Sequence, residues 1–136
     1  MKRELKERYS FQELLDIVAE LRSEDGCPWD RVQTYESLKK CLSDEAQEVL
    51  DAVDRQDIPN LQEELGDVLL QVIFYADIAR EKGQFTIDDV MSGLGRKLIR
   101  RHPHVFGDLK VESPEEALNL WRKVKAEEKA GKFGEL

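Results

Sequence analysis

The sequence predicts an all-α protein, a bundle of about five helices with a four-helix core completed by dimerisation. Two observations carry the fold class. Apolar residues recur at three- and four-residue steps in five successive segments, and helix-start signatures precede most of these segments. In addition, no segment shows the apolar–polar alternation typical of a half-buried strand. No segment is therefore predicted to form a strand.

The length of 136 residues suits a single domain over 1–136, with residues 1–9 and 131–136 expected to be loosely held. The net charge of -8 argues against nucleic acid as a partner, because a phosphate backbone requires a basic surface. There is no apolar run long enough for a membrane span and no signal-peptide core near the start. We therefore expect a cytoplasmic protein in which Cys27 and Cys41 are free thiols.

The first two helices are expected on either side of a Gly-Cys-Pro loop. Ser10 and Glu13 form a capping-box pattern ahead of a helix over 11–24. Residues 27–33 are predicted to form a loop, and Thr34 is expected to cap a helix over 35–55. Trp29 in this loop has two interpretations: it plugs the end of the core, or it contacts a ligand.

The third helix is predicted over 59–82, between the cap Asp57 and the terminating Gly83. Its interior is apolar on nearly every side, which predicts that a second subunit covers one side. The remaining elements are expected to be a helix over 87–101, a loop over 102–112 and a last helix from Pro114 to near Gly131.

Two carboxylate pairs mark the candidate site. Glu45 and Glu48 lie three residues apart in the second predicted helix, and Glu64 and Asp67 have the same spacing in the third. Side chains at this spacing share a helix face, so facing helices would direct four carboxylates at one volume. Acidic pairs also occur on solvated helix faces, but both pairs here lie beside an apolar stripe. The pattern favours a bound cation.

Mg²⁺ is the cation that this ligand set favours. It prefers oxygen ligands and commonly joins carboxylates to substrate phosphates, and Mn²⁺ is an alternative ion. Zinc is disfavoured because the pairs include neither His nor Cys. A di-iron carboxylate bundle is rejected, because its Glu-x-x-His motif requires a helical His and both His102 and His104 fall in a predicted loop.

A polyphosphate bound through Mg²⁺ also requires cationic groups. Lys97 and Arg101 lie four residues apart on one helix face and can contact phosphates, or they answer the helix dipole at its C-terminal turn. Trp121 can stack on a base, or it is an ordinary core residue. Both alternatives remain open for each residue.

The chain resembles the MazG-like nucleotide pyrophosphohydrolases. The resemblance rests on the segment CPWD followed by Gln33 and Thr34, the acidic segments DEAQE and EELGD, KLIRRHPHVFGD from Lys97, and WRKVKAEEK from Trp121. The family pattern has Glu where this chain has Asp44, so the role of Asp44 stays open.

The resemblance implies a Mg²⁺-dependent enzyme that hydrolyses (deoxy)nucleoside triphosphates at the α–β phosphate bond, giving a monophosphate and pyrophosphate. It implies a homodimer or a dimer of dimers, with no nucleic acid and no membrane as partner. The acids Glu45, Glu48, Glu64 and Asp67 would hold the metal, and Glu45 or Glu48 would also polarise the attacking water. Substrate contacts would come from Lys97, Arg101, Trp121 and Trp29.

Two other hypotheses remain. One is a relative in the same superfamily that is specific for dUTP, dCTP or phosphoribosyl-ATP. The other is a non-enzymatic helical dimer that binds a nucleotide or a protein. The sequence leaves open the base and sugar preference, the number of metal ions, the choice between dimer and tetramer, and the biological role.

Overall fold

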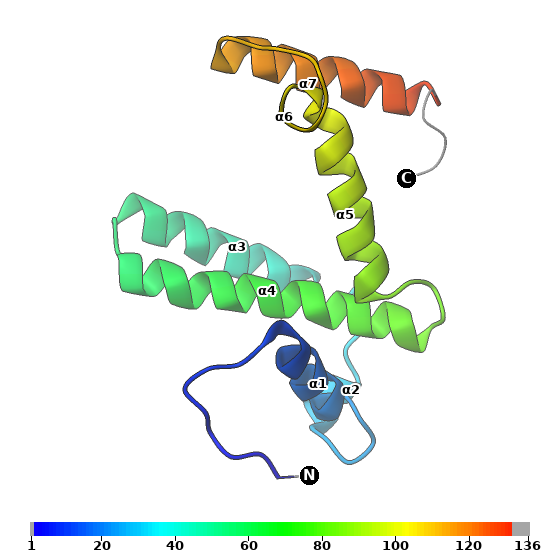
Figure 1. The fold of residues 1–136 in the computed structure, drawn as a ribbon. Coiled ribbons are helices and arrows are strands. Elements are labelled where there is room, and N and C mark those ends of the chain that lie inside the picture. The colour runs from blue at the N-terminus through cyan, green and yellow to red at the C-terminus, as the bar shows by residue number, and fades with distance from the viewer. Residues whose placement is uncertain (1, 132–136) are drawn as a thin grey trace. The chain divides into compact units, whose positions relative to one another are not determined.

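A computed structural model describes residues 2–131, which fold into helices joined by turns, with no strand in that range. The all-α prediction is confirmed, and the five expected long helices are present. Two further helices of four residues each were not predicted. In chain order (Figure 1) the helices are α1 (Phe11–Leu21), α2 (Pro28–Arg31), α3 (Lys39–Asp54), α4 (Ile58–Glu81), α5 (Ile87–Arg101), α6 (Pro103–Phe106) and α7 (Pro114–Lys129).

Capping hydrogen bonds and a left-handed glycine explain several helix boundaries. The Ser10 hydroxyl accepts from the Glu13 amide at 3.1 Å, while the Glu13 carboxylate accepts from the Ser10 amide at 3.0 Å, as the capping-box pattern predicts. Asp57 caps α4 by accepting from the Asn60 amide. Gly83 follows the end of α4 with φ 67°, a left-handed conformation that glycine adopts without strain.

Four predictions about helix and loop boundaries were wrong. The segments 27–33 and 102–112 are not simple loops, because a proline at the first helical position starts α2 and α6 within them. The first helix ends at Leu21 rather than at residue 24. The second long helix starts at Lys39, because Thr34 and Ser37 exchange backbone–hydroxyl bonds in a turn that precedes it.

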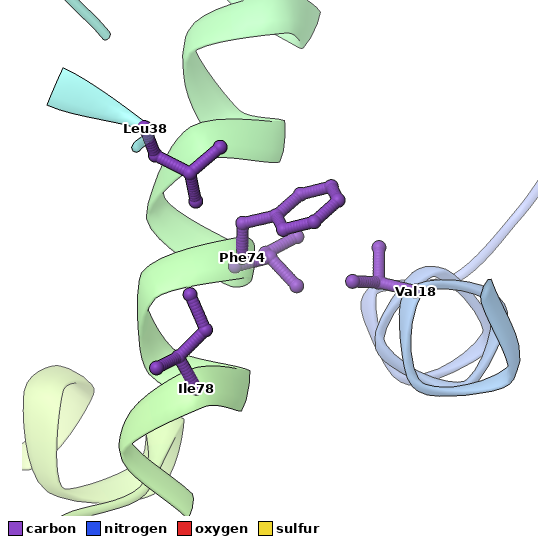
Figure 2. Close-up of a cluster of buried hydrophobic side chains, with 5 residues drawn as sticks. Val18, Leu38, Phe74 and Ile78 are labelled. Atoms are coloured by element: carbon purple, nitrogen blue, oxygen red, sulfur yellow. The ribbon is translucent and has the colours of Figure 1, made fainter. Parts of the chain in front are cut away.

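The chain divides into two compact units, Met1–Ile87 and Asp88–Leu136. In the first unit α3 and α4 form an antiparallel hairpin, and α1 packs against α4 (Figure 1). Figure 2 shows the core, where Val18 of α1 faces Phe74 and Ile78 of α4 beside Leu38. These side chains are almost completely buried. The core therefore fixes α1 and the start of α3 on α4.

The hairpin turn between α3 and α4 is tight. Gln56 adopts φ 54°, and the amides of Gln56 and Asp57 bond the carbonyls of Val53 and Ala52, both at 3.0 Å. A left-handed residue other than glycine is costly, by roughly 1–2 kcal/mol. The turn accepts this conformation and thereby reverses the chain within a few residues.

A buried arginine ties three helices of the first unit together. The Arg22 side chain is 2% exposed, and its Nη1 lies 3.0 Å from Asp77 Oδ2 and 2.9 Å from Glu81 Oε1 of α4. Its Nε donates to the carbonyl of Asp30 in α2 at 3.2 Å. Arg80 contacts the same Asp77 from the exposed side. This network satisfies a charge that would otherwise be costly to bury.

In the second unit, Val124 and Arg101 are buried, and Arg101 joins α5 to α7 through Glu128. The expectation that residues 1–136 form a single domain stays a prediction. Residues 2–9 have no helix or strand, yet Arg3 pairs with Glu20 at 2.6 Å. Of the expected loose tail, residues 132–136 lie outside the described range. Between residues 2 and 131, no helix is both long and apolar enough to cross a bilayer.

Replacing Arg22 with Met is expected to lower the free energy of unfolding by about 3 kcal/mol, because it leaves Asp77 and the Asp30 carbonyl without their buried partner. Arg80→Met is the matched control. It removes a contact to the same carboxylate from a side chain that is 54% exposed, and should cost about 0–1 kcal/mol. Urea unfolding followed by circular dichroism measures both. Equal losses in the two variants would contradict a special role for the buried contact.

Candidate metal centre and nucleotide site

The four predicted acids converge on one volume. Glu45 and Glu48 project from α3, and Glu64 and Asp67 project from the facing α4. One carboxylate oxygen from each residue lies within 4.8 Å of the other three. The i,i+3 spacing places each pair on one helix face, and the pairing of α3 with α4 brings the two faces together.

The clustering raises the affinity of these carboxyls for protons. A hydrogen bond with Glu48, followed by burial and the charges of Glu48, Asp67 and Glu45, raises the pKa of Glu64 to about 7. Burial, followed by the charges of Glu48 and Asp67, raises the pKa of Glu45. Four negative charges at this separation repel one another, so the group binds either a proton or a cation.

The oxygens of the cluster are suited to a hard cation. Glu45 Oε2 and Glu64 Oε2 are buried atoms without a hydrogen-bond partner. Buried polar atoms without a partner are uncommon in folded proteins, and a cation bound by the cluster would satisfy both oxygens. All four ligating groups are carboxylates, the donor type that Mg²⁺ and Mn²⁺ prefer, and no thiol or imidazole belongs to the group.

A second layer of polar contacts orients Glu64. With its amide turned so that both atoms are satisfied, Asn60 donates to Glu64 Oε1 at 3.1 Å and accepts from Arg55 Nη2 at 3.1 Å. Arg55 and Asn60 flank the hairpin turn, so the turn itself positions one of the four acids. Sequence reasoning missed both residues. Asn60 lies four residues before Glu64 on the same helix face, a spacing that signals such a contact.

Asp44 lies outside the cluster. Its carboxylate accepts from Lys40 Nζ at 2.7 Å in an i,i+4 pair on the surface of α3, and its side chain is 56% exposed. The local cation Lys40 therefore neutralises Asp44, which takes no part in the four-acid cluster.

Trp29 lies on α2 in the first unit, and it is 56% exposed. The interpretation that it plugs the end of the core is therefore wrong within this chain. The backbone carbonyl of Trp29 accepts a hydrogen bond from Gln33 Nε2 at 2.8 Å, which helps to fix the backbone at this residue. The alternative interpretation, a contact with a ligand, remains a prediction.

The three predicted substrate contacts near the C-terminus all lie in the second unit, where Arg101 and Trp121 meet. Arg101 Cζ lies 5.1 Å from the centroid of the Trp121 ring, and Lys125 Nζ lies 4.9 Å from it. Lys97 lies one turn before Arg101 on α5. A cavity of about 330 Å³ adjoins this stack and is lined by His102, Ala117, Leu118 and Trp121.

Glu128 is a partner of this group that sequence reasoning missed. Its Oε2 accepts from Arg101 Nε at 3.0 Å and from Arg101 Nη2 at 2.7 Å. Glu128 lies on the same face of α7 as Trp121 and Lys125, and this spacing is the signal that could have identified it. The pairing with Arg101 spans 27 residues, so no local pattern predicts it.

Comparisons with known proteins agree with the motifs. Residues 33–106 match the MazG nucleotide pyrophosphohydrolase domain. This match includes the four clustered acids, Lys97 and Arg101.

Two curated relatives match nearly the whole chain. A Thermotoga maritima protein named nucleoside triphosphate pyrophosphohydrolase/pyrophosphatase MazG is 54% identical over 90% of this chain and 46% of its own length. An Escherichia coli K12 protein named nucleoside triphosphate pyrophosphohydrolase is 47% identical over 88% of this chain and 46% of its own. The chain thus spans about half the length of these curated relatives.

A solved structure supports the same assignment. The crystal structure of a MazG-related protein from Thermotoga maritima is 32% identical, covers 85% of this chain and 98% of that one, and superimposes with a TM-score of 0.70. Since the domain match covers more than half of the sequence and the solved relative is matched over nearly its full length, the chain belongs to the family of MazG nucleotide pyrophosphohydrolase domains.

Proposed function

We propose that the protein hydrolyses (deoxy)nucleoside triphosphates at the α–β phosphate bond, with Mg²⁺, to a nucleoside monophosphate and pyrophosphate. The observation that carries this proposal is the cluster of four carboxylates with two buried oxygens that have no partner. The family and the names of the curated relatives support a nucleoside triphosphate as substrate.

Glu45, Glu48, Glu64 and Asp67 are the proposed metal ligands, with Mn²⁺ as an alternative ion. Mg²⁺ held there would supply positive charge that offsets the negative charge of the phosphate oxygens. Glu45 or Glu48 accepts a proton from the attacking water at a carboxylate oxygen. Asn60 keeps Glu64 oriented through its amide, and Arg55 keeps the Asn60 amide in place.

Lys97 and Arg101 are the proposed phosphate contacts, because both are cations on one face of α5. Trp121 and the adjoining cavity are proposed to take the base. The cavity has aromatic and apolar walls, which suit the flat face of a nucleobase. Trp29 is proposed as a further substrate contact, since its indole is exposed on a short ordered helix.

We also propose that the protein is a homodimer, alone or paired into a dimer of dimers. Leu65, Leu69 and Val72 form an i, i+4, i+7 stripe on α4, and each is between 38% and 51% exposed. Leu50 and Val53 on α3 are more than half exposed as well. Exposed apolar side chains on both helices of a hairpin are typical of a surface that a second copy covers.

Asp67→Asn and Glu48→Gln are expected to lower pyrophosphate release by at least about 100-fold, because each removes a metal ligand. Asp44→Asn is the matched control and should remain within about twofold of the parent, since Asp44 pairs with Lys40 outside the cluster. A panel of ribo- and deoxynucleotides, assayed for pyrophosphate and for phosphate with Mg²⁺ or EDTA, measures activity, bond and preference together. Release of phosphate instead of pyrophosphate would show that a different bond is cleaved.

The metal-free protein is expected to lose stability as pH rises through about 7. The pKa of Glu64 is raised to about 7 in the folded protein, so folding binds protons that the unfolded chain releases above its ordinary pKa of 4.5. This stabilisation is complete below pH 4.5 and is lost as pH rises through 7. Thermal melting in EDTA from pH 5.5 to 8 measures it, and added Mg²⁺ should raise the melting temperature most at pH 8.

Glu64→Gln should flatten this pH dependence, whereas the exposed neighbour Glu63→Gln should leave it unchanged. A melting temperature in EDTA that rises between pH 5.5 and 8 would contradict the expected sign.

Leu69→Lys is expected to convert the dimer into a monomer, because it places a charge in the middle of the apolar stripe. Glu63→Lys introduces the same side chain at an exposed polar position of α4 and should leave the mass unchanged. Size-exclusion chromatography with light scattering gives the mass. A parent protein that is monomeric at micromolar concentration would refute the dimer.

A further inference from the structure

The second unit contains a buried carboxylate to which the proposed function gives no role. Glu128 lies near the end of α7, and its side chain is 6% exposed. A carboxylate is seldom buried to this extent without a partner, and Glu128 has two charge-assisted hydrogen bonds from one guanidinium. Arg101, the proposed phosphate contact, therefore already has an anionic partner within the chain.

Glu128 binds only one edge of the Arg101 guanidinium. Both bonds come from the Nε–Nη2 edge of the guanidinium and end on a single oxygen, Glu128 Oε2. The outer edge, formed by Nη1 and the second hydrogen of Nη2, is directed away from that carboxylate. A guanidinium can bind two oxygens of a phosphate with such an edge. Glu128 thus occupies one edge of Arg101, whose side chain is 10% exposed, and does not occupy the other edge.

The face of the same guanidinium is fixed as well. Arg101 Cζ lies 5.1 Å from the centroid of the Trp121 ring, a cation–π distance. Lys125, one turn after Trp121 on α7, lies 4.9 Å from the same centroid. Arg101 is therefore held at one edge by Glu128 and on one face by Trp121, whose ring lines the cavity of about 330 Å³.

Glu128 is also the negative charge among three cations. The hydrogen bond from Arg101, followed by burial, which opposes it, and by the charges of Arg101, Arg100 and Lys97, leaves the pKa of Glu128 below its ordinary value. Arg100 Nη1 lies 4.0 Å from Glu128 Oε1. Without this carboxylate, the three cations would repel one another at the position where α5 meets α7.

We propose that Glu128 is a positioning residue for phosphate recognition. It orients Arg101 so that the outer edge of the guanidinium faces the nucleotide, and it keeps the Arg101–Trp121 stack in place beside the cavity. This inference rests on the proposed function, because it assumes that Arg101 binds a phosphorylated substrate. The alternative is that Glu128 is a placeholder, a carboxylate that competes with phosphate for the same edge of Arg101. Removing Glu128 should weaken phosphate binding if it is a positioning residue and strengthen it if it is a placeholder.

The experiment compares Glu128→Ala and Glu128→Gln with the control Glu127→Gln. Positioning predicts that Glu128→Ala raises KM by about tenfold and changes kcat less than about threefold, because phosphate binding is lost while the acids that act on water are intact. Glu128→Gln keeps one acceptor oxygen and should give an intermediate KM. Glu127→Gln should match the parent.

Binding is read independently of turnover. ATP is titrated in EDTA into a Trp29→Phe background, in which Trp121 is the remaining tryptophan and its fluorescence reports the stack. Glu128→Ala should weaken ATP binding by about tenfold. If Glu128 acts through Arg101, the double variant Arg101→Lys with Glu128→Ala should bind ATP no more weakly than Arg101→Lys alone.

Three results would overturn the proposal. Unchanged KM and ATP affinity with a lowered melting temperature would make the pair purely structural. Tighter ATP binding by Glu128→Ala would make Glu128 a placeholder. Additive losses in the double variant would separate Glu128 from Arg101. A parent that binds ATP but releases no pyrophosphate from any nucleotide refutes the proposed function alone, and the titration then decides the role of Glu128.

Discussion

Repulsion among four carboxylates is the constraint on which the first unit depends. Glu45, Glu48, Glu64 and Asp67 have been brought together by a helical hairpin, and the raised pKa values of Glu45 and Glu64 record the free energy that this arrangement costs. The apolar core formed by Val18, Leu38, Phe74 and Ile78 opposes that repulsion from the other end of the hairpin. The site is thus strained electrostatically and stabilised by packing elsewhere, as is usual where charge has to be held ready for a ligand.

The hairpin turn is part of the site as well as part of the fold. Gln56 adopts a left-handed conformation, which lets α4 start at Ile58, only four residues after Asp54 ends α3. Arg55 and Asn60 lie on either side of this turn. Arg55 donates a hydrogen bond to the Asn60 amide, which in turn donates to Glu64. A short chain of hydrogen bonds therefore links the strained backbone of the turn to the orientation of the Glu64 carboxylate.

Much of this arrangement could be predicted from the sequence, because helical periodicity is a local property. The i,i+3 spacing identified all four clustered acids, although the role of Asp44 stayed open, and the caps at Ser10 and Asp57 located two helix starts. The short helices α2 and α6 could not be predicted in this way, since four residues are too few to show a period. The partners of Arg22 and Arg101 were also beyond reach, because Asp77 and Glu128 lie 55 and 27 residues away and only the folded chain brings them close.

The Arg22 network has a consequence for molecular recognition. Arg22 bonds the backbone of α2 at Asp30 and the acids of α4 with one side chain, so the exposed indole of Trp29 projects from a segment whose conformation is already set. A flexible loop loses conformational entropy when it meets another molecule, and that loss weakens the contact. Here the loss has occurred during folding, so whatever packs on this indole retains more of the free energy of burying it. A buried arginine that does not belong to the four-acid cluster thus holds a surface aromatic side chain in a fixed position for contact.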